Sequence, residues 1–438
     1  MKSRVWLLGI GCWLLAVSCW VLPANAQRAL DCITQSRNFA AGNYSVYPDS
    51  VLPALTPAPE GYQLFYLSHY GRHGSRYLND RKGFDIPYKM LMSADSLRQL
   101  TPTGHHVLHE IRLIIEDSER RWGDLTDTGK QQHRDITRRM TEHFPEVFSG
   151  DRQIVARSTI VPRCILSMGA ALQTLANINP QLQISLQASN RDMWYMNHQD
   201  KKLRKGAMTP EAEKAYRDFC AKRERNPRLM RLLFYHPDSV SSVVDEVTLN
   251  YYIIKMGILQ QNTHLHERTY LMELFTNEEL YMLWQQENAW WFINHGFTSL
   301  NGSSQPYTQR HLLRHIITDA DSCLRMEQPP VHLRYGHETV LLPLVCLLGV
   351  NGYDLHTDNL EDLEQFGWIA TLVFPMASNL QFAFYRRSLD DDDVLFKVLL
   401  NEREATLPLA TDCAPYYHWS DFRQHYLKLL DEYKPQKK

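Results

Sequence analysis

Two arginines that bracket a histidine are the first residues in this chain whose types and spacing could do chemistry. Arg72 and Arg76 stand on either side of His73. Gly71 and Gly74 flank Arg72 and His73. Because glycine has no side chain, the backbone at these positions can come close to a ligand. Arginine offers planar, paired donors that stay charged at any working pH, which suits a phosphate monoester. Because neighbouring cations lower its proton affinity, His73 should keep one ring nitrogen free to attack phosphorus and form a phosphohistidine.

Two later stretches would complete a phosphatase site. Arg163 lies at the predicted start of a helix, where the helix dipole also favours an anion. His337 is suited to donate a hydrogen bond to a non-bridging phosphate oxygen. Glu338 is suited to protonate the leaving alkoxide and then to take a proton from the attacking water, which predicts an acidic to near-neutral pH optimum. Since the arginines neutralise charge, we expect no metal and no other cofactor.

Predicted strands precede all three stretches. Residues 63–68, 153–156 and 331–335 are each predicted to form a short strand, and the second and third are followed by helical patterns. Ligands of open α/β sheets bind at the carboxyl ends of the strands. The order of elements therefore predicts that the three stretches meet at one edge of a sheet.

The domain organisation follows from a change of pattern in the middle of the chain. Residues 189–302 are charged and aromatic, with helical periodicity and few strand signals. We interpret this segment as a mostly α-helical domain inserted into an α/β domain that is formed by residues 27–188 and 303–438. The predicted fold class is α/β, with a central mixed, mostly parallel sheet flanked by helices.

Two near-copies of one sequence motif, at residues 100–104 and 125–129, predict the starts of two consecutive helices. Thr101 and Thr126 are suitable N-caps, and Pro102 fits the first helical position, where its missing N–H costs nothing. Two copies are too few to indicate a repeat architecture.

The other segments have local signals only. Residues 27–61 are predicted to be an irregular arm, and residues 75–88 a loop near the mouth of the site. Residues 380–384 and 394–400 predict an antiparallel strand pair. The acidic run at residues 390–393 is interpreted as the solvated loop between them, because it lacks the spacing of an EF-hand calcium loop.

Residues 1–26 have the pattern of an export signal, with a basic start, an apolar stretch and small residues before the cleavage point. Lipidation at Cys19 is the alternative processing. No other stretch is apolar and long enough to span a bilayer. The sequence therefore predicts a periplasmic or secreted protein, with a lipid anchor as the rival.

Composition narrows the partners. The full chain has 47 basic and 49 acidic residues. Removal of the signal takes away Lys2 and Arg4, which leaves a net charge of about −4 and disfavours a nucleic-acid binder. We expect a small-molecule phosphate ester as the partner. The cysteines beyond the signal are too sparse for a disulfide scaffold but permit one or two bridges. They are Cys32, Cys164, Cys220, Cys323, Cys346 and Cys413.

Taken together, these motifs resemble the histidine acid phosphatases, the two-domain branch of the histidine phosphatase superfamily that includes phytases and multiple inositol polyphosphate phosphatases. Residues 72–76 resemble the nucleophile motif, and residues 158–163 resemble the segment with a third phosphate-binding arginine. The resemblance spans essentially the whole mature chain, including the helical insertion. It implies His73 as nucleophile, Glu338 as proton donor, and phosphate binding by Arg72, Arg76, Arg163 and His337.

The chain departs from the family pattern at two points. Tyr77 follows the second motif arginine, where many members soon have a proline. Glu338 directly follows the histidine, whereas phytases commonly have aspartate there and inositol polyphosphate phosphatases commonly have glutamate two residues later. The longer acid changes the reach of the proton donor by about one methylene, which bears on the choice of leaving group.

Two basic clusters in the predicted insertion bear on the substrate. If they face the cleft, they would hold the further phosphates of an inositol polyphosphate, which makes phytate-like substrates the first hypothesis. Solvated helix faces are the alternative, with sugar phosphates as substrates. A phosphate-binding protein without turnover would need neither His73 nor Glu338, and a metal-dependent hydrolase would lose activity in chelator. The clusters are Lys201, Lys202, Arg204 and Lys205, and Lys222, Arg223, Arg225, Arg228 and Arg231.

The other histidines and the tryptophans are interpreted as structural. His105 and His109 are four residues apart and residues 264–267 contain a His-x-His-Glu group, but neither has a third ligand at a persuasive spacing for a metal. The aromatic residues between 284 and 292 are predicted to form core and not a platform for sugar stacking.

Overall fold

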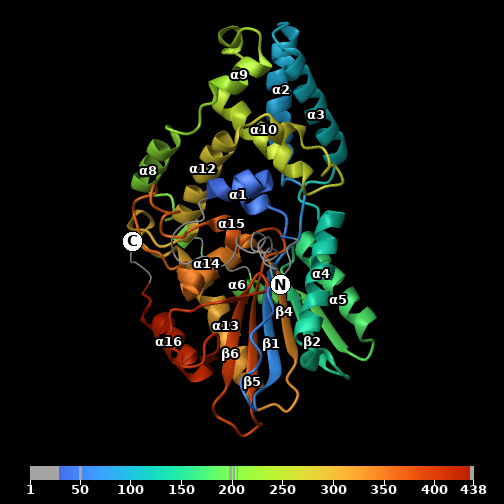
Figure 1. The fold of residues 1–438 in the computed structure, drawn as a ribbon, viewed down its shortest axis with the longest axis vertical. Coiled ribbons are helices and arrows are strands. Elements are labelled where there is room, and N and C mark those ends of the chain that lie inside the picture. The colour runs from blue at the N-terminus through green and yellow to red at the C-terminus, as the bar shows by residue number, and fades with distance from the viewer. Residues whose placement is uncertain (1–28, 49–51, 197–199, 201–202, 205, 435–438) are drawn as a thin grey trace, which may run out of the picture.

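The computed structural model of the chain is shown in Figure 1. The predicted export signal and three lysines of the first basic cluster lie outside the described residues. Within the described part of the chain, no helix has both the length and the apolar character needed to cross a membrane. The structure describes residues 29–48, 52–196, 200, 203–204 and 206–434.

The described residues form one eight-stranded sheet with the order β3-β2-β4-β1-β5-β6-β7, and β8 pairs with β6. The pairs β3-β2, β2-β4 and β4-β1 are parallel, whereas β5, β6, β7 and β8 add antiparallel pairs. This topology confirms the predicted mixed sheet, but with three parallel and four antiparallel pairs among the described strands the sheet is not mostly parallel. The strands are β1 (Gln63–Arg72), β2 (Gln153–Ser158), β3 (Gln183–Ala188), β4 (Val331–Gly336), β5 (Asn379–Arg386), β6 (Leu395–Leu400), β7 (Arg403–Ala405) and β8 (Tyr417–His418).

Helices cover both faces of the sheet, because the strands bury apolar side chains on each side. One face carries α4 (Asp127–His143) and α5 (Pro162–Ile178). The opposite face carries α13 (Arg310–Cys323), α14 (Glu338–Leu348) and α16 (Trp419–Glu432). The predicted strand pair near the carboxyl terminus is confirmed, with the acidic run in the loop between β5 and β6.

A separate group of helices, called here the helical cap, stands at the end of the molecule away from the sheet (Figure 1). It comprises α2 (Lys82–Ser96), α3 (Pro102–Ser118), α9 (Pro227–Leu233) and α10 (Glu246–Gln260). Further helices and 3-10 turns are α1 (Ala29–Gln35), η1 (Arg37–Tyr44), η2 (Pro145–Phe148), η3 (Asn190–Asp192), α6 (Met193–Met196), α8 (Pro210–Cys220), η4 (Pro237–Val240), α11 (Tyr270–Glu273), α12 (Asn277–His295), η5 (Ser299–Asn301), η6 (Gln305–Gln309), η7 (Val350–Gly352) and α15 (Ala370–Val373).

The boundaries of the predicted insertion do not coincide with this packing. Helices α2 and α3 precede residue 189, yet their apolar faces join the core of the cap with α9 and α10. Conversely, α12 reaches down from the cap to α14 and α15. The aromatic residues of α12 are core as predicted, since Trp284, Trp291 and Phe292 are buried.

Two segments predicted as irregular are helical in part. The predicted arm contains α1 and η1, and Ala29 and Ile33 of α1 are fully buried in the core of the cap. The predicted loop at residues 75–88 ends early, because α2 begins at Lys82 and includes Pro87. Burial of Phe84 and Leu91 in the cap outweighs the local turn signals.

The capped helices are confirmed, and the disulfides that the sequence permits do not form among the cysteines considered below. The side chains of Thr101 and Thr126 accept hydrogen bonds from the backbone N–H groups of Gly104 and Gly129, each at 3.1 Å. No disulfide forms among five of the six cysteines. The five thiols are Cys164, Cys220, Cys323, Cys346 and Cys413.

Candidate active site

Arg72 is the last residue of β1 and is fully buried. Its Nη1 donates to the backbone carbonyls of Asn43 and Phe374, each at 2.6 Å. Its Nε lies 3.1 Å from Oε2 of Glu338. Nη2 is buried without a hydrogen-bond partner among the described residues, so it remains available to an anionic ligand.

His73 follows directly and is also fully buried. Its Nδ1 lies 2.9 Å from the carbonyl oxygen of Gly74, which can only accept, so Nδ1 carries the hydrogen. Burial lowers the pKa of His73 well below its ordinary value, and Arg72 and Arg76 lower it further against the opposing effect of Glu338. The imidazole is therefore neutral, and its Nε2 lone pair is free for attack on phosphorus.

The loop that carries His73 is held by two helices on the same face of the sheet. The backbone N–H of Gly74 donates to Oγ of Ser167 in α5 at 3.1 Å, and that of Ser75 donates to Oε1 of Gln132 in α4 at 2.9 Å. A Cβ on Gly74 would lie 2.3 Å from the carbonyl oxygen of Gly129, at the start of α4. Glycine is therefore required where this loop meets α4.

Arg76 and Arg163 reach the same space from different elements. Nη1 of Arg76 donates to the hydroxyl of Tyr44 at 2.7 Å and to the carbonyl of Tyr77 at 2.9 Å. Arg163 is the second residue of α5, and burial together with the charge of Arg76 lowers its pKa. In both residues Nε is buried without a hydrogen-bond partner among the described residues. Two guanidinium groups that repel each other are a suitable arrangement for a shared anion.

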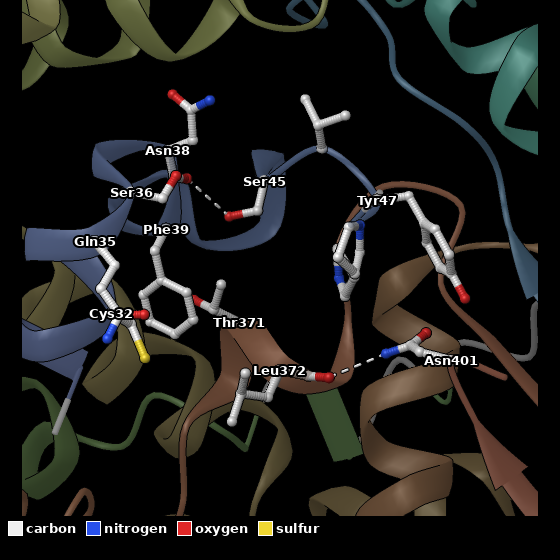
Figure 2. Close-up of a pocket in the computed structure, with 13 residues that line it drawn as sticks. Cys32, Gln35, Ser36, Asn38, Phe39, Ser45, Tyr47, Thr371, Leu372 and Asn401 are labelled. Carbon is white, nitrogen blue, oxygen red and sulfur yellow. Dashed lines mark hydrogen bonds between the residues drawn. The ribbon is translucent and has the colours of Figure 1, made fainter. Parts of the chain in front are cut away.

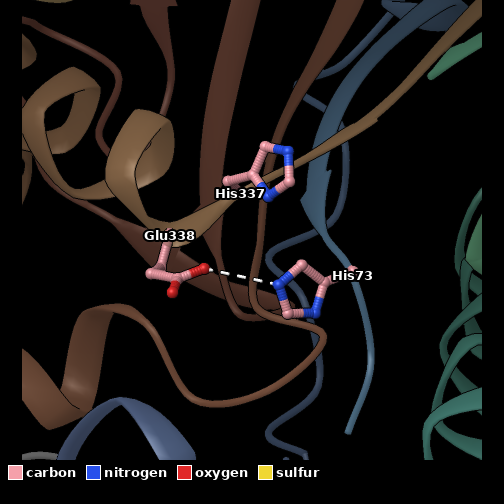
Figure 3. Close-up of side chains that lie close together, drawn as sticks. All are labelled: His73, His337 and Glu338. Carbon is pink, nitrogen blue, oxygen red and sulfur yellow. Dashed lines mark ion pairs between the residues drawn. The ribbon is translucent and has the colours of Figure 1, made fainter. Parts of the chain in front are cut away.

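His337 is the N-cap of α14, directly after β4. Its Nε2 lies 3.2 Å from Oγ1 of Thr159, and its ring centroid lies 5.6 Å from that of His73. Burial lowers the pKa of His337 to about 4, and Arg163 also lowers it, while Glu338 opposes them. A neutral His337 beside His73 can donate one hydrogen bond to a bound phosphate (Figure 3).

Glu338 is the first residue of α14 and is almost fully buried. Its Oε2 lies 3.5 Å from Nε2 of His73, as Figure 3 shows, and its Oε1 accepts from Nδ2 of Asn43 at 3.5 Å. Burial alone would raise its pKa, but the positive charge of Arg72 and, after it, that of Arg76 counter burial, and the pKa lies well below the ordinary value. A phosphate dianion among the arginines would offset that positive charge and raise the pKa of Glu338 again.

The structure thus brings together all six residues that the sequence predicts for the site, from the ends of β1 and β4 and the start of α5. It also adds two that the sequence reasoning missed. Asn43 and Tyr44, at the end of η1, contact Glu338, Arg72 and Arg76. No local pattern marks these two residues, because their contacts join segments far apart in the chain.

The same three side chains could geometrically surround a metal ion. One ligand atom from each of His73, His337 and Glu338 lies within 4.8 Å of the others. The arginines beside them make the space strongly positive, which favours an anion over a cation. The other histidines, interpreted above as structural, do not form such a group among the described residues: His105 lies 3.6 Å from Asp95, and His264 lies 3.2 Å from Asp117.

The second basic cluster is paired within the protein. Lys222 lies 3.2 Å from Glu361, Arg225 lies 2.8 Å from Glu246, and Arg228 and Arg223 form ion pairs with Glu279 and Glu361. These ion pairs favour the alternative in which these four residues belong to solvated helix faces and loops. From the first cluster, Arg204 is described and exposed. Burial lowers the pKa of His295, the charge of Arg204 lowers it further, and the charge of Glu338 opposes both effects. Arg204 and Glu338 therefore both lie within electrostatic reach of His295.

A pocket of about 410 Å³ lies on another side of the segment that contributes Asn43 (Figure 2). It contains none of the six predicted site residues, so it is not the catalytic cleft. Its lining residues are Cys32, Gln35, Ser36, Asn38, Phe39, Ser45, Val46, Tyr47, Pro48, Thr371, Leu372, Pro375 and Asn401.

Comparison with known proteins places this geometry in context. A family model described as the histidine phosphatase superfamily (branch 2) matches residues 71–401. The human multiple inositol polyphosphate phosphatase 1 is 27% identical over 148 residues, which is 32% of this chain and 30% of that enzyme. The match thus spans less than a third of the human enzyme's length.

Among solved structures, the Bifidobacterium longum multiple inositol polyphosphate phosphatase in complex with inositol hexasulfate is similar, with a TM-score of 0.72 and 16% identity. That similarity covers 88% of this chain and 97% of the other. The phytase from D. castellii has a TM-score of 0.67 and 12% identity, and covers 90% of this chain and 85% of its own. At these identities the similarity is one of fold.

Proposed function

Because the chain belongs to branch 2 of the histidine phosphatase superfamily, we propose that it is a phosphomonoesterase that works through a phosphohistidine at His73. The family supports phosphatase activity, and the site geometry supports the individual roles. The observation that carries the mechanism is the environment of His73. Its Nδ1 hydrogen is engaged by the carbonyl of Gly74, so that Nε2 is left without a hydrogen and faces the carboxyl of Glu338 at 3.5 Å.

In the first step, Nε2 of His73 attacks phosphorus and the P–O bond to the leaving group breaks. Glu338, protonated once the substrate dianion has offset the arginines, gives its proton to the leaving oxygen, and an alcohol departs. Arg72, Arg76 and Arg163 hold the non-bridging oxygens as negative charge shifts among them. His337 donates a further hydrogen bond.

In the second step, the carboxylate of Glu338 takes a proton from water, and the resulting nucleophile attacks phosphorus. The N–P bond breaks, its electron pair returns to Nε2 of His73, and inorganic phosphate leaves. Glu338 is again protonated, so the cycle closes without a net proton change on the enzyme. Each group therefore acts twice, which explains why the acid must lie within reach of the nucleophile.

Inositol polyphosphates are the proposed substrates. The partial similarity to the human inositol polyphosphate phosphatase supports this choice, and so does the exposed Arg204, which like Glu338 lies within electrostatic reach of His295. The second candidate is a phosphatase for smaller esters such as sugar phosphates. The pairing of Arg225 and Arg228 with glutamates favours this alternative, because it removes cations that a polyphosphate would need.

We also propose that the protein acts after export, as a periplasmic or secreted enzyme. The support is the signal-like pattern of residues 1–26. Amino-terminal sequencing of the protein recovered from the producing cells tests this. A mature amino terminus at Gln27 is expected, and a protein recovered with Met1 in place would contradict export with cleavage.

The function is tested by hydrolysis of phytate and of a hexose phosphate in the presence of chelator, with the wild type and with His73→Ala. The wild type should release phosphate from both esters, faster from phytate, and the variant should lose at least about 10³-fold in rate. Equal rates for the two proteins would overturn the nucleophile. An active wild type that spares phytate would overturn the choice of substrate, and loss of activity in chelator would indicate a metal-dependent hydrolase.

A further inference from the structure

We propose that Asn43 is a positioning residue for the proton donor, so that the segment ahead of β1 is part of the active site. The side chain of Asn43 is 7% exposed, and its Nδ2 donates to Oε1 of Glu338 at 3.5 Å. Its backbone carbonyl accepts from Nη1 of Arg72 at 2.6 Å. The family match begins at residue 71, so this contact comes from outside the matched region. The proposal rests on the proposed function, since it gives Asn43 a role through Glu338.

The segment around Asn43 is fixed from several directions. Gly42 has a left-handed φ of 56°, and its carbonyl accepts from the backbone N–H of Ser45 at 3.1 Å, which closes a tight turn around Asn43. The carbonyl of Ser45 in turn accepts from the N–H of Met376 at 2.8 Å. Asn262, just after α10, donates to the carbonyl of Tyr44 at 2.8 Å. A side chain on so constrained a turn can orient a carboxyl group.

One further contact reinforces the turn from the side away from the site, and a second joins two other residues of the pocket lining. Oγ of Ser45 donates to the carbonyl of Asn38 at 3.2 Å, and Nδ2 of Asn401 donates to the carbonyl of Leu372 at 3.0 Å, as Figure 2 shows. The turn therefore packs against a pocket wall on one side and against catalytic groups on the other.

The chemistry of an amide suits this position. Glu338 must exist both as a carboxylate and as a carboxylic acid during one turnover. Arg72 carries donors only, so it favours the carboxylate. The amide of Asn43 has both a donor and an acceptor: its NH2 group serves the carboxylate, and rotation of the amide by 180° presents its oxygen to the acid. The present distance is long, as is common before substrate is bound, and we expect it to shorten in the complex.

Two near-isosteric substitutions isolate this side chain, because the backbone contact with Arg72 persists in both. Asn43→Leu removes the amide, and Asn43→Asp replaces it with a carboxylate. Each is tested on an alkyl phosphate, whose leaving group needs a proton, and on p-nitrophenyl phosphate, whose leaving group departs as a stable anion. Glu338→Gln sets the reference pattern, since loss of the acid should affect the alkyl ester far more.

Asn43→Leu should lower kcat/KM, which reports the step that expels the leaving group, about tenfold for the alkyl phosphate and leave that of p-nitrophenyl phosphate within about twofold. Asn43→Asp should move the alkaline limb of the kcat profile upward by about one pH unit, because a second carboxylate disfavours ionisation of Glu338. Wild-type rates and profiles in both variants would overturn the proposal, as would equal losses for both esters. Full activity of His73→Ala would instead overturn the phosphohistidine mechanism, whatever the Asn43 variants do.

Discussion

The arginines at the sheet edge differ from those beside the helical cap in whether carboxylates of the protein already pair with their donors. Arg72 is buried and Arg163 is half-buried, and each keeps a buried guanidinium nitrogen without a hydrogen-bond partner among the described residues. Arg225 and Arg228 each meet a glutamate. Burial lowers the pKa of Arg163, whereas hydrogen bonding to Glu246 raises the pKa of Arg225. One set has donors available for an anion, and the other has already used them.

A phosphate site is therefore marked by hydrogen-bond donors that folding leaves unpaired, and not by the density of positive charge in the sequence. Residues 222–231 are the more basic stretch, yet the fold supplies carboxylates for most of them. At the sheet edge, among the residues that the structure describes, Glu338 is the one carboxylate that pairs with Arg72 and Arg76, and Arg163 has no ion pair. The remaining positive charge can be balanced by a phosphate dianion.

The largest expected effect separates the two sets of arginines directly. Arg163→Ala should lower kcat/KM for any phosphate ester by about 10²-fold to 10³-fold, because a charge-assisted donor to the transferring group is lost. Arg225→Ala should stay within about twofold, since an exposed ion pair contributes little. Steady-state kinetics on one ester measures both variants. Comparable losses in the two would erase the distinction between them.

The next prediction tests whether activity depends on how the backbone at Gly74 places His73 beside the arginines. Gly74→Ala should cost about 10²-fold in kcat, because its Cβ would meet the backbone of Gly129 and displace His73. The control is Gly169→Ala in α5, where a Cβ meets nothing within 4 Å. That variant should fold and turn over like the wild type. Unchanged kcat in Gly74→Ala would show that the loop tolerates movement.

A smaller effect compares two tyrosine–arginine pairs. Tyr44→Phe removes the acceptor that orients Arg76 and should raise KM about threefold to tenfold, the worth of one ordinary hydrogen bond. Tyr77→Phe removes a hydroxyl that accepts from Arg121 at 2.5 Å, away from the phosphate donors. KM should change by less than about twofold there. Initial-rate measurements over a range of substrate concentrations decide the comparison.

The smallest effect is a persistence of activity in acid. A histidine of ordinary pKa would lose its nucleophilic form below about pH 6.5. The pKa of His73 lies well below that value and that of His337 is about 4, so both stay neutral as the pH falls from 7 to 5. The rate should therefore hold within about twofold over this range and fall on approach to pH 4. A decline that begins near pH 6.5 would contradict the burial of His73.

The parts of the molecule that the sequence predicted are those with local signals. Apolar strands followed by caps and glycines placed the site residues on β1, β4 and α5. Contacts between distant segments left no such trace. Asn43 and Glu338 are 295 residues apart in the chain, and Arg228 meets Glu279 only because α9 and α12 pack in the cap. For the same reason, burial in the cap made a helix of α2 despite Pro87.

The pairing of β1 has a consequence for biosynthesis. The strand that ends in Arg72 pairs with β4, which begins at Val331, and with β5, which begins at Asn379. A nascent chain therefore carries this apolar strand with both edges open until most of the polypeptide has been made. Such long-range pairing forms slowly, and open edges invite aggregation. The nucleophile thus gains its final environment late, and a chain truncated before residue 379 would expose one side of β1.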